Sequence, residues 1–121
     1  MRTSSALGAI FFATTASSWM VSLTGYSDIA CNGTAGRTLE YDMDVKGPIF
    51  SECGKCPNGG DCGSYLYTAS SDVNCYVFTF GTDTCDEPEV SSNEYQAQSG
   101  LCVSPSDGII RSYRWNCERD S

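Results

Sequence analysis

The chain of 121 residues contains no histidine, and only seven of its residues are lysine or arginine. Without histidine, neither a Ser/His nor a Cys/His catalytic pair can form, and a zinc site that depends on imidazole is excluded. The scarcity of cations disfavours nucleic acid as a partner, because phosphate contacts need clustered lysines and arginines. Fifteen acidic residues bring the formal net charge to −8, which also disfavours binding to anionic membranes.

Long hydrophobic runs are missing as well. The apolar run at residues 6–16 follows a positively charged start and precedes small residues, and it is shorter than the roughly 20 residues that span a bilayer. This order is typical of a secretory signal peptide. We therefore expect a leader at residues 1–18, cleaved after Ala16 or Ser18. Residues 19–121 are expected to form one extracellular domain with a net charge of −9 and no membrane insertion.

The cysteines and one glycosylation sequon fit the same export route. The sequon begins at Asn32 and predicts a surface position in a secreted chain. An even number of cysteines in a secreted chain predicts up to four disulfides, each worth about 2–4 kcal/mol. Their pairing stays open, because eight cysteines allow 105 connectivities. All eight follow the expected cleavage site: Cys31, Cys53, Cys56, Cys62, Cys75, Cys85, Cys102 and Cys117.

Two other uses of the cysteines deserve comparison with disulfides. Cys53 and Cys56 have the spacing of a redox pair, but Pro57-Asn58-Gly59-Gly60 follows them, where a thioredoxin-like site needs a helix. With Cys62 and a fourth thiolate the same pair could bind zinc, although a second C-x2-C is absent. Disulfides are the expected use in an oxidising compartment.

The apolar pattern predicts strands and no convincing helix. Residues 39–45 alternate between apolar and charged positions, and residues 73–80 are aromatic and β-branched, as in a central strand. Residues 86–100 are polar and acidic and predict a surface loop. The pattern favours an all-β sandwich or small barrel. Further strands are expected at residues 19–23, 64–68 and 109–115, with a turn at Asp107-Gly108.

A weak internal repeat divides the chain. An aromatic residue precedes a cysteine by five positions at Tyr26 and again at Phe80, 54 residues later. Ser64 begins the sequence Ser-Tyr-Leu-Tyr, and Ser112 begins Ser-Tyr-Arg-Trp 48 residues later. The order of an aromatic turn followed by a Ser-Tyr strand therefore occurs twice.

These residues resemble the βγ-crystallin family. Tyr26 and Gly33 match its opening frame of an aromatic, six residues and a glycine, whereas Glu87 replaces that glycine in the second half. Ser64 and Ser112 match the serine that packs onto the folded corner and satisfies its backbone groups. The resemblance implies a small disulfide-rich Greek-key β-sandwich made of two motifs.

The wider resemblance is to small secreted cysteine-rich fungal proteins, including effectors and killer-toxin-like proteins. Family members often bind calcium through paired Asn or Asp residues, but Arg111 precedes Ser112 here, and a cation at that place would repel Ca²⁺. We therefore expect no metal site and no cofactor.

The seven tyrosines suit either a small core or a contact surface for sugar or protein. We expect most aromatics to fill the core, Tyr41, Tyr76 and Phe78 among them. Tyr95, in the expected acidic loop, is the candidate for an exposed contact. The other residues considered for such a surface are Tyr65, Tyr67, Tyr113 and Trp115.

No catalytic set emerges, so a non-enzymatic role is expected. The favoured hypothesis is a secreted binding protein, effector-like or toxin-like, whose partner is a host or competitor protein or a cell-wall glycan. One alternative is a small secreted hydrolase that uses carboxylates as acid and base. The other is a passive structural component of a cell wall.

Overall fold

The computed structural model describes residues 19–44, 47–105 and 108–119 as an all-β protein. The expected leader, Asp107 and the last two residues lie outside these ranges. The strands are β2 (Met20–Tyr26), β3 (Ala35–Asp42), β4 (Ile49–Phe50), β5 (Gly54–Lys55), β6 (Ser64–Ala69), β7 (Val73–Phe80), β8 (Glu89–Tyr95), β9 (Gln98–Val103) and β10 (Ser112–Arg119). Two short 3-10 turns, η2 (Ile29–Cys31) and η3 (Pro57–Gly59), accompany them.

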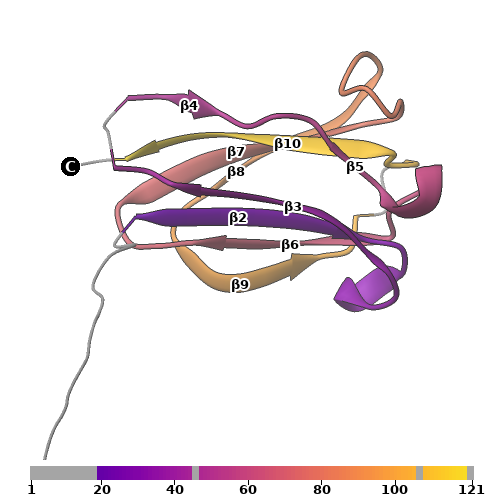
Figure 1. Ribbon diagram of the computed structural model, residues 1–121, viewed down its shortest axis with the longest axis horizontal. Helices are drawn as coiled ribbons and strands as arrows, with labels where there is room; N and C mark the ends of the chain where they lie inside the picture. The colour runs from indigo at the N-terminus through magenta and orange to yellow at the C-terminus, as the bar shows by residue number, and fades with distance from the viewer. Residues whose placement is uncertain (1–18, 45–46, 106–107, 120–121) are drawn as a thin grey trace, which may run out of the picture.

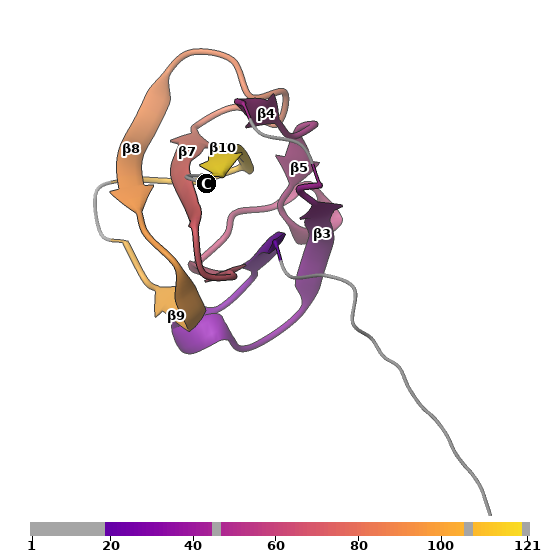
Figure 2. The same cartoon turned by 90° about the vertical axis from the view of Figure 1, so that its left-hand side faces the viewer.

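The strands form two sheets that lie one over the other (Figure 1). In the first sheet the order is β3-β2-β6-β9, and in the second it is β4-β10-β7-β8, with β5 also paired to β10. All of these pairings are antiparallel. Figure 2, which looks along the strands, shows β8 and β9 following one another in the chain while they lie in different sheets.

Each half of the chain lends a strand to the other half. The first half, β2 to β6, supplies three strands of the first sheet and gives β4 and β5 to the second. The second half, β7 to β10, supplies three strands of the second sheet and gives β9 to the first. The two halves are therefore interlocked, and neither completes a four-stranded sheet alone.

Period-2 alternation explains which side chains enter the core. Along β7, Val73, Cys75 and Val77 are almost fully buried, while the residues between them point to the outer face. Tyr113 and Trp115 are likewise buried on the inner face of β10. The central position of residues 73–80, between β10 and β8, is confirmed.

Two sequence predictions about the backbone are wrong. Residues 86–100, expected to be a surface loop, contain β8 and the start of β9. Their polar sequence resembles that of a loop because β8 is an edge strand, which pairs with β7 alone in the described sheet and alternates little between buried and exposed positions. The last strand also begins at Ser112 rather than at Ile109, since Ile110 makes only an isolated bridge to Cys62.

All eight cysteines lie in the described ranges and form disulfides. Cys53 and Cys56 belong to different bridges, so neither the redox pair nor the thiolate zinc site exists. Such bridges are typical of proteins that mature in an oxidising compartment. The pairs are Cys31–Cys102, Cys53–Cys85, Cys56–Cys62 and Cys75–Cys117.

Candidate functional site

The residues singled out by the repeat build a folded corner in the first half. Ser64, fully buried at the start of β6, donates to the carbonyl of Asp28 at 2.6 Å and accepts from the amide of Cys31 at 2.8 Å. Gly33 has φ +84°, and a Cβ there would collide with the Ser27 hydroxyl. Only glycine adopts this conformation without strain. These contacts hold the turn that follows β2.

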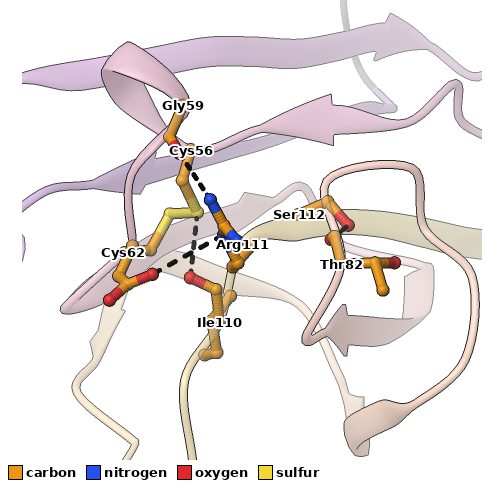
Figure 3. Close-up of polar contacts among 8 residues, drawn as sticks. Cys56, Gly59, Cys62, Thr82, Ile110, Arg111 and Ser112 are labelled. Atoms are coloured by element: carbon orange, nitrogen blue, oxygen red, sulfur yellow. Dashed lines mark hydrogen bonds and ion pairs between the residues drawn. A yellow bond between two sulfur atoms is a disulfide. The ribbon is translucent and has the colours of Figure 1, made fainter.

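The second half repeats the corner with one difference. Ser112 donates to the carbonyl of Thr82 at 2.6 Å (Figure 3). It accepts from the amide of Cys85 at 3.0 Å and lies beside buried Phe80. Both corner cysteines have φ +56°. Glu87, in place of the glycine, is not among the positive-φ residues of the described chain, so no glycine is needed there.

The tyrosines that follow Ser64 are also structural. The hydroxyls of Tyr65 and Tyr95 are 2.8 Å apart, and Tyr67 donates to the carbonyl of Gln96 at 3.2 Å. Burial, reinforced by Tyr95, raises the pKa of Tyr67 to about 12 and raises that of Tyr65 as well. Tyr95 is half-buried and packs its ring 5.2 Å from Tyr67. The expectation of an exposed contact at Tyr95 is therefore wrong, because its ring closes the core.

The matching residues of the second half reach across the sandwich in the same way. Tyr113 donates to the carbonyl of Arg37 at 2.7 Å, and the Trp115 indole donates to the carbonyl of Leu39 at 3.0 Å. Burial raises the pKa of Tyr113. In both halves, two aromatic side chains of the strand that begins at the serine thus form hydrogen bonds with the opposite half, to a hydroxyl in the case of Tyr65 and to backbone carbonyls in the other three.

Arg111, beside the second corner, fixes the loop that contains η3 (Figure 3). Its guanidinium donates to the carbonyl of Gly59 at 2.8 Å and lies 3.7 Å from a carboxylate oxygen of Asp61. The Cys56–Cys62 bridge closes the same loop. Within the described ranges, no cluster of three or more metal-ligating side chains occurs. This end of the sandwich is therefore built for structure.

A different set of side chains covers the outer face of the second sheet. Tyr76 and Phe78 point outward from β7, with ring centroids 6.3 Å apart. The register places Asn116 and then Phe50 beside Tyr76. Tyr76 is 44% exposed and Phe50 61% exposed. We call this outer face, with Arg114, Glu94 and Glu118, the aromatic face.

Arg114 occupies the middle of the aromatic face. Its guanidinium carbon lies 5.3 Å from the Phe78 ring centroid and 5.8 Å from that of Phe80, which is cation–π geometry. Its Nε atom is buried without a hydrogen-bond partner in the described structure. The guanidinium therefore contacts the half-buried Phe78 ring and the buried Phe80 ring.

A shallow hollow of about 200 Å³ opens beside Tyr76 on this face. Cys75 and Cys117, whose buried disulfide joins the adjacent strands β7 and β10, are among its lining residues. Its polar lining consists of two carboxylates and two carboxamides around an aromatic ring. The lining side chains on the outer surface are Pro48, Asn74, Tyr76, Glu94, Asn116 and Glu118.

The outer face of the first sheet is built from other residue types. Ser22 lies between Glu40 and Thr68 in the register, and Thr24 lies beside Thr38, with their hydroxyls 2.7 Å apart. No aromatic ring occurs in these rows. The exposed aromatic residues of the sheets are therefore concentrated on the second sheet, apart from Tyr41 at the edge of the first, which is 40% exposed.

The expectation that Tyr41 and Tyr76 fill the core is wrong. Residues 73–80 are apolar on both faces in their second half, which suggested burial on both sides. The neighbouring strand carried the missing signal, because Arg114, Asn116 and Glu118 alternate with its buried residues. A polar outer face on β10 implies a solvent-exposed outer face on β7 as well.

Asn32, the expected glycosylation site, is exposed beside the first corner. Glycosylation there stays a prediction. Asn32 follows β2 of the first sheet, whereas the aromatic face belongs to the second sheet.

Comparison of the chain with protein-family models, with curated proteins and with solved structures finds no match. None of the helices in the described ranges has the length and apolar character needed to cross a bilayer.

Proposed function

We propose that this chain is a secreted, non-enzymatic binding protein, effector-like or toxin-like, whose partner is an extracellular protein or a cell-wall glycan. One observation carries the proposal. The serines and aromatic residues of the repeat are used inside the fold, whereas Tyr76 and Phe50 remain exposed on one sheet face. Exposed aromatic side chains gathered on a flat face are typical of recognition surfaces.

The same proposal includes a βγ-crystallin-like Greek-key fold. Two findings support it: each half lends a strand to the sheet of the other, and each corner places a buried serine between a carbonyl and an amide. A crystal structure in which β4 pairs with the strands of its own half would contradict this assignment.

Expression of the full chain in a secreting eukaryotic host tests the export step. We expect the product in the medium, beginning at Ser17 or Trp19, with its intact mass reduced by the eight hydrogens lost in forming four disulfides. Peptide mapping checks the pairing. Retention in the cell with residues 1–18 still attached and free thiols would overturn the proposal.

A carboxylate-dependent hydrolase is the second candidate. Glu94 and Glu118 line the hollow beside Tyr76, and glycoside hydrolysis uses two carboxylates that flank one bond. We expect no release of reducing sugars from polysaccharides by the purified protein. Turnover that disappears in both Glu94→Gln and Glu118→Gln, with binding retained, would move the assignment to this class.

A further inference from the structure

We propose that the aromatic face binds a neutral polysaccharide chain, with one sugar ring in the hollow beside Tyr76. This inference rests on the proposed function and names both the surface and the class of partner. The ligand is an uncharged chain of sugar rings, and it lies along β7 from the hollow toward Phe78.

Charge on the aromatic face favours an uncharged ligand. The face carries a cation at Arg114 and carboxylates at Glu94 and Glu118. The ion pairs of the described chain are Arg37–Glu52 and Arg111–Asp61, and neither lies on this face. An anionic chain is repelled by the glutamates and by the acidic protein, and the guanidinium of Arg114 offsets part of the attraction that the two carboxylates exert on a cationic chain. Neutral hydroxyl groups, in contrast, can donate to carboxylates and accept from the guanidinium.

Ring stacking supplies the apolar part of the recognition. The planes of Tyr76 and Phe78 differ by 26°, so the two rings present similar orientations. A sugar ring has a C–H face whose burial against an aromatic ring removes apolar surface from water. Asn116 lies beside Tyr76 in the register and offers a carboxamide for the hydroxyls at the rim of such a ring.

The size of the face favours a glycan over a protein or a second copy of this chain. Four strands spaced at sheet distance, with the longest of eight residues, span roughly 500 Å² in projection. Stable protein interfaces bury about 800 Å² of accessible surface on each partner, a quantity larger than the projected area of the same patch, so a protein partner would need nearly the whole face. Because β4 has two residues, the usable area is smaller still. A single extended chain of sugars needs only a strip of this surface.

Retention on insoluble polysaccharides tests the proposal. The secreted, disulfide-bonded protein is incubated with chitin, cellulose and β-1,3-glucan particles, and the bound fraction is measured against concentration at low and high salt. We expect saturable retention on at least one neutral particle that does not weaken with salt. The anionic polymer pectate and the cationic polymer chitosan serve as charge controls: pectate should retain less, and any retention on chitosan should weaken with salt.

Variants locate the site. Tyr76→Ala should weaken retention about tenfold or more, as expected for an aromatic anchor, and Tyr76→Phe should preserve it because the ring remains. Tyr41→Ala is the matched control, since Tyr41 is similarly exposed but lies at the edge of the other sheet. Thermal unfolding and intact mass establish that each variant is folded and fully disulfide-bonded.

The outcomes separate this inference from the proposed function. Retention that is unchanged by Tyr76→Ala, or equally lost in Tyr41→Ala, overturns the aromatic face as the site while leaving a glycan-binding protein. Retention only on pectate or chitosan overturns the neutral ligand. No retention on any particle overturns the inference, and the export experiment then decides separately whether a secreted protein remains.

Discussion

Each half of the chain stabilises its folded corner with an equivalent buried serine, but the residues around that serine differ between the halves. Ser64 and Ser112 make equivalent pairs of hydrogen bonds. The first corner then needs Gly33 at positive φ, whereas the second continues through Glu87. The two sheets also differ outside the core, because the second exposes the rings of Tyr76 and Phe50, whereas serine and threonine occupy the rows around Ser22 and Thr24 on the outer face of the first.

This difference separates residues required by the fold from residues free to vary. The residues that both halves share are buried. The serine is bonded within the corner of its own half, and the tyrosine after it and the aromatic residue two positions further on are bonded across the sandwich. What only the second half has, the outward pair Tyr76 and Phe78, makes no such bond across the sandwich. We infer that the shared residues maintain the fold and the unshared ones are available for binding.

Removing disulfides is the strongest test of whether the two folded corners are equivalent. Cys31–Cys102 and Cys53–Cys85 each tie a corner to the strands lent by the other half, and they close loops of 71 and 32 residues. Replacing both cysteines of either pair by serine should lower the free energy of unfolding by about 4 kcal/mol. Denaturant unfolding measures this loss.

The Cys56–Cys62 bridge is the control, because its separation is only 6 residues. Its removal should cost about 2 kcal/mol by the same loop-closure reasoning. If removing either corner bridge lowers the free energy of unfolding by no more than removing this control bridge does, the two corner bridges do not stabilise the fold equally.

Serine removal tests the corners themselves. Ser64→Ala and Ser112→Ala each leave a backbone amide and a carbonyl without their partner, and both serines are fully buried. We expect a loss of about 3 kcal/mol in each case, measured by denaturant unfolding. Ser104→Ala is the control, because Ser104 also accepts from a corner amide, that of Ala30, but at an exposed position. A small effect at Ser112 with a large one at Ser64 would contradict the comparison.

Alkaline pH should weaken the contribution of Tyr67 to stability but not that of its counterpart Trp115. An unfolded tyrosine ionises near pH 10, whereas burial raises the pKa of Tyr67 to about 12. The stability that neutral Tyr67 contributes is therefore complete below pH 10 and is lost as the pH rises through about 12. Melting temperatures and tyrosinate absorbance across this range measure the loss. Its counterpart Trp115 has no ionisable group. Tyr67→Phe should make the profile shallower, with Tyr65 and Tyr113 still contributing because burial raises the pKa of both, and an unchanged profile would contradict this assignment.

The fold was predictable where one face of a strand is buried. Residues 73–80 matched β7 at both ends, because alternating Val73, Cys75 and Val77 required a core on one side. The strands within residues 86–100 were not predictable, because β8 at the sheet edge buries few side chains and its polar sequence resembles that of a loop. The disulfide pairing depends on which strands the halves exchange, and this exchange is a property of the whole topology.

The candidate site could be predicted only in part. The repeat paired Ser64 with Ser112, and the βγ-crystallin resemblance implied that they satisfy backbone groups at a bend, which is what their hydrogen bonds do. The sequence assigned Tyr76 to the core and Tyr95 to the surface, and the structure reverses both. Local sequence indicates that a strand is apolar on both faces, but only the neighbouring strands determine which face is covered.

The smallest expected effect concerns the residue in which the corners differ. Gly33→Ala places a Cβ at φ +84° against Ser27, whose hydroxyl already accepts from the amide of Thr34 at 2.8 Å. We expect a loss of about 1–2 kcal/mol in the free energy of unfolding. Glu87→Ala, at the equivalent position, should change it by less than about 0.5 kcal/mol. Equal losses at the two positions would mean that the second corner depends on Glu87 as the first depends on its glycine, and that the two turns share more than their serines.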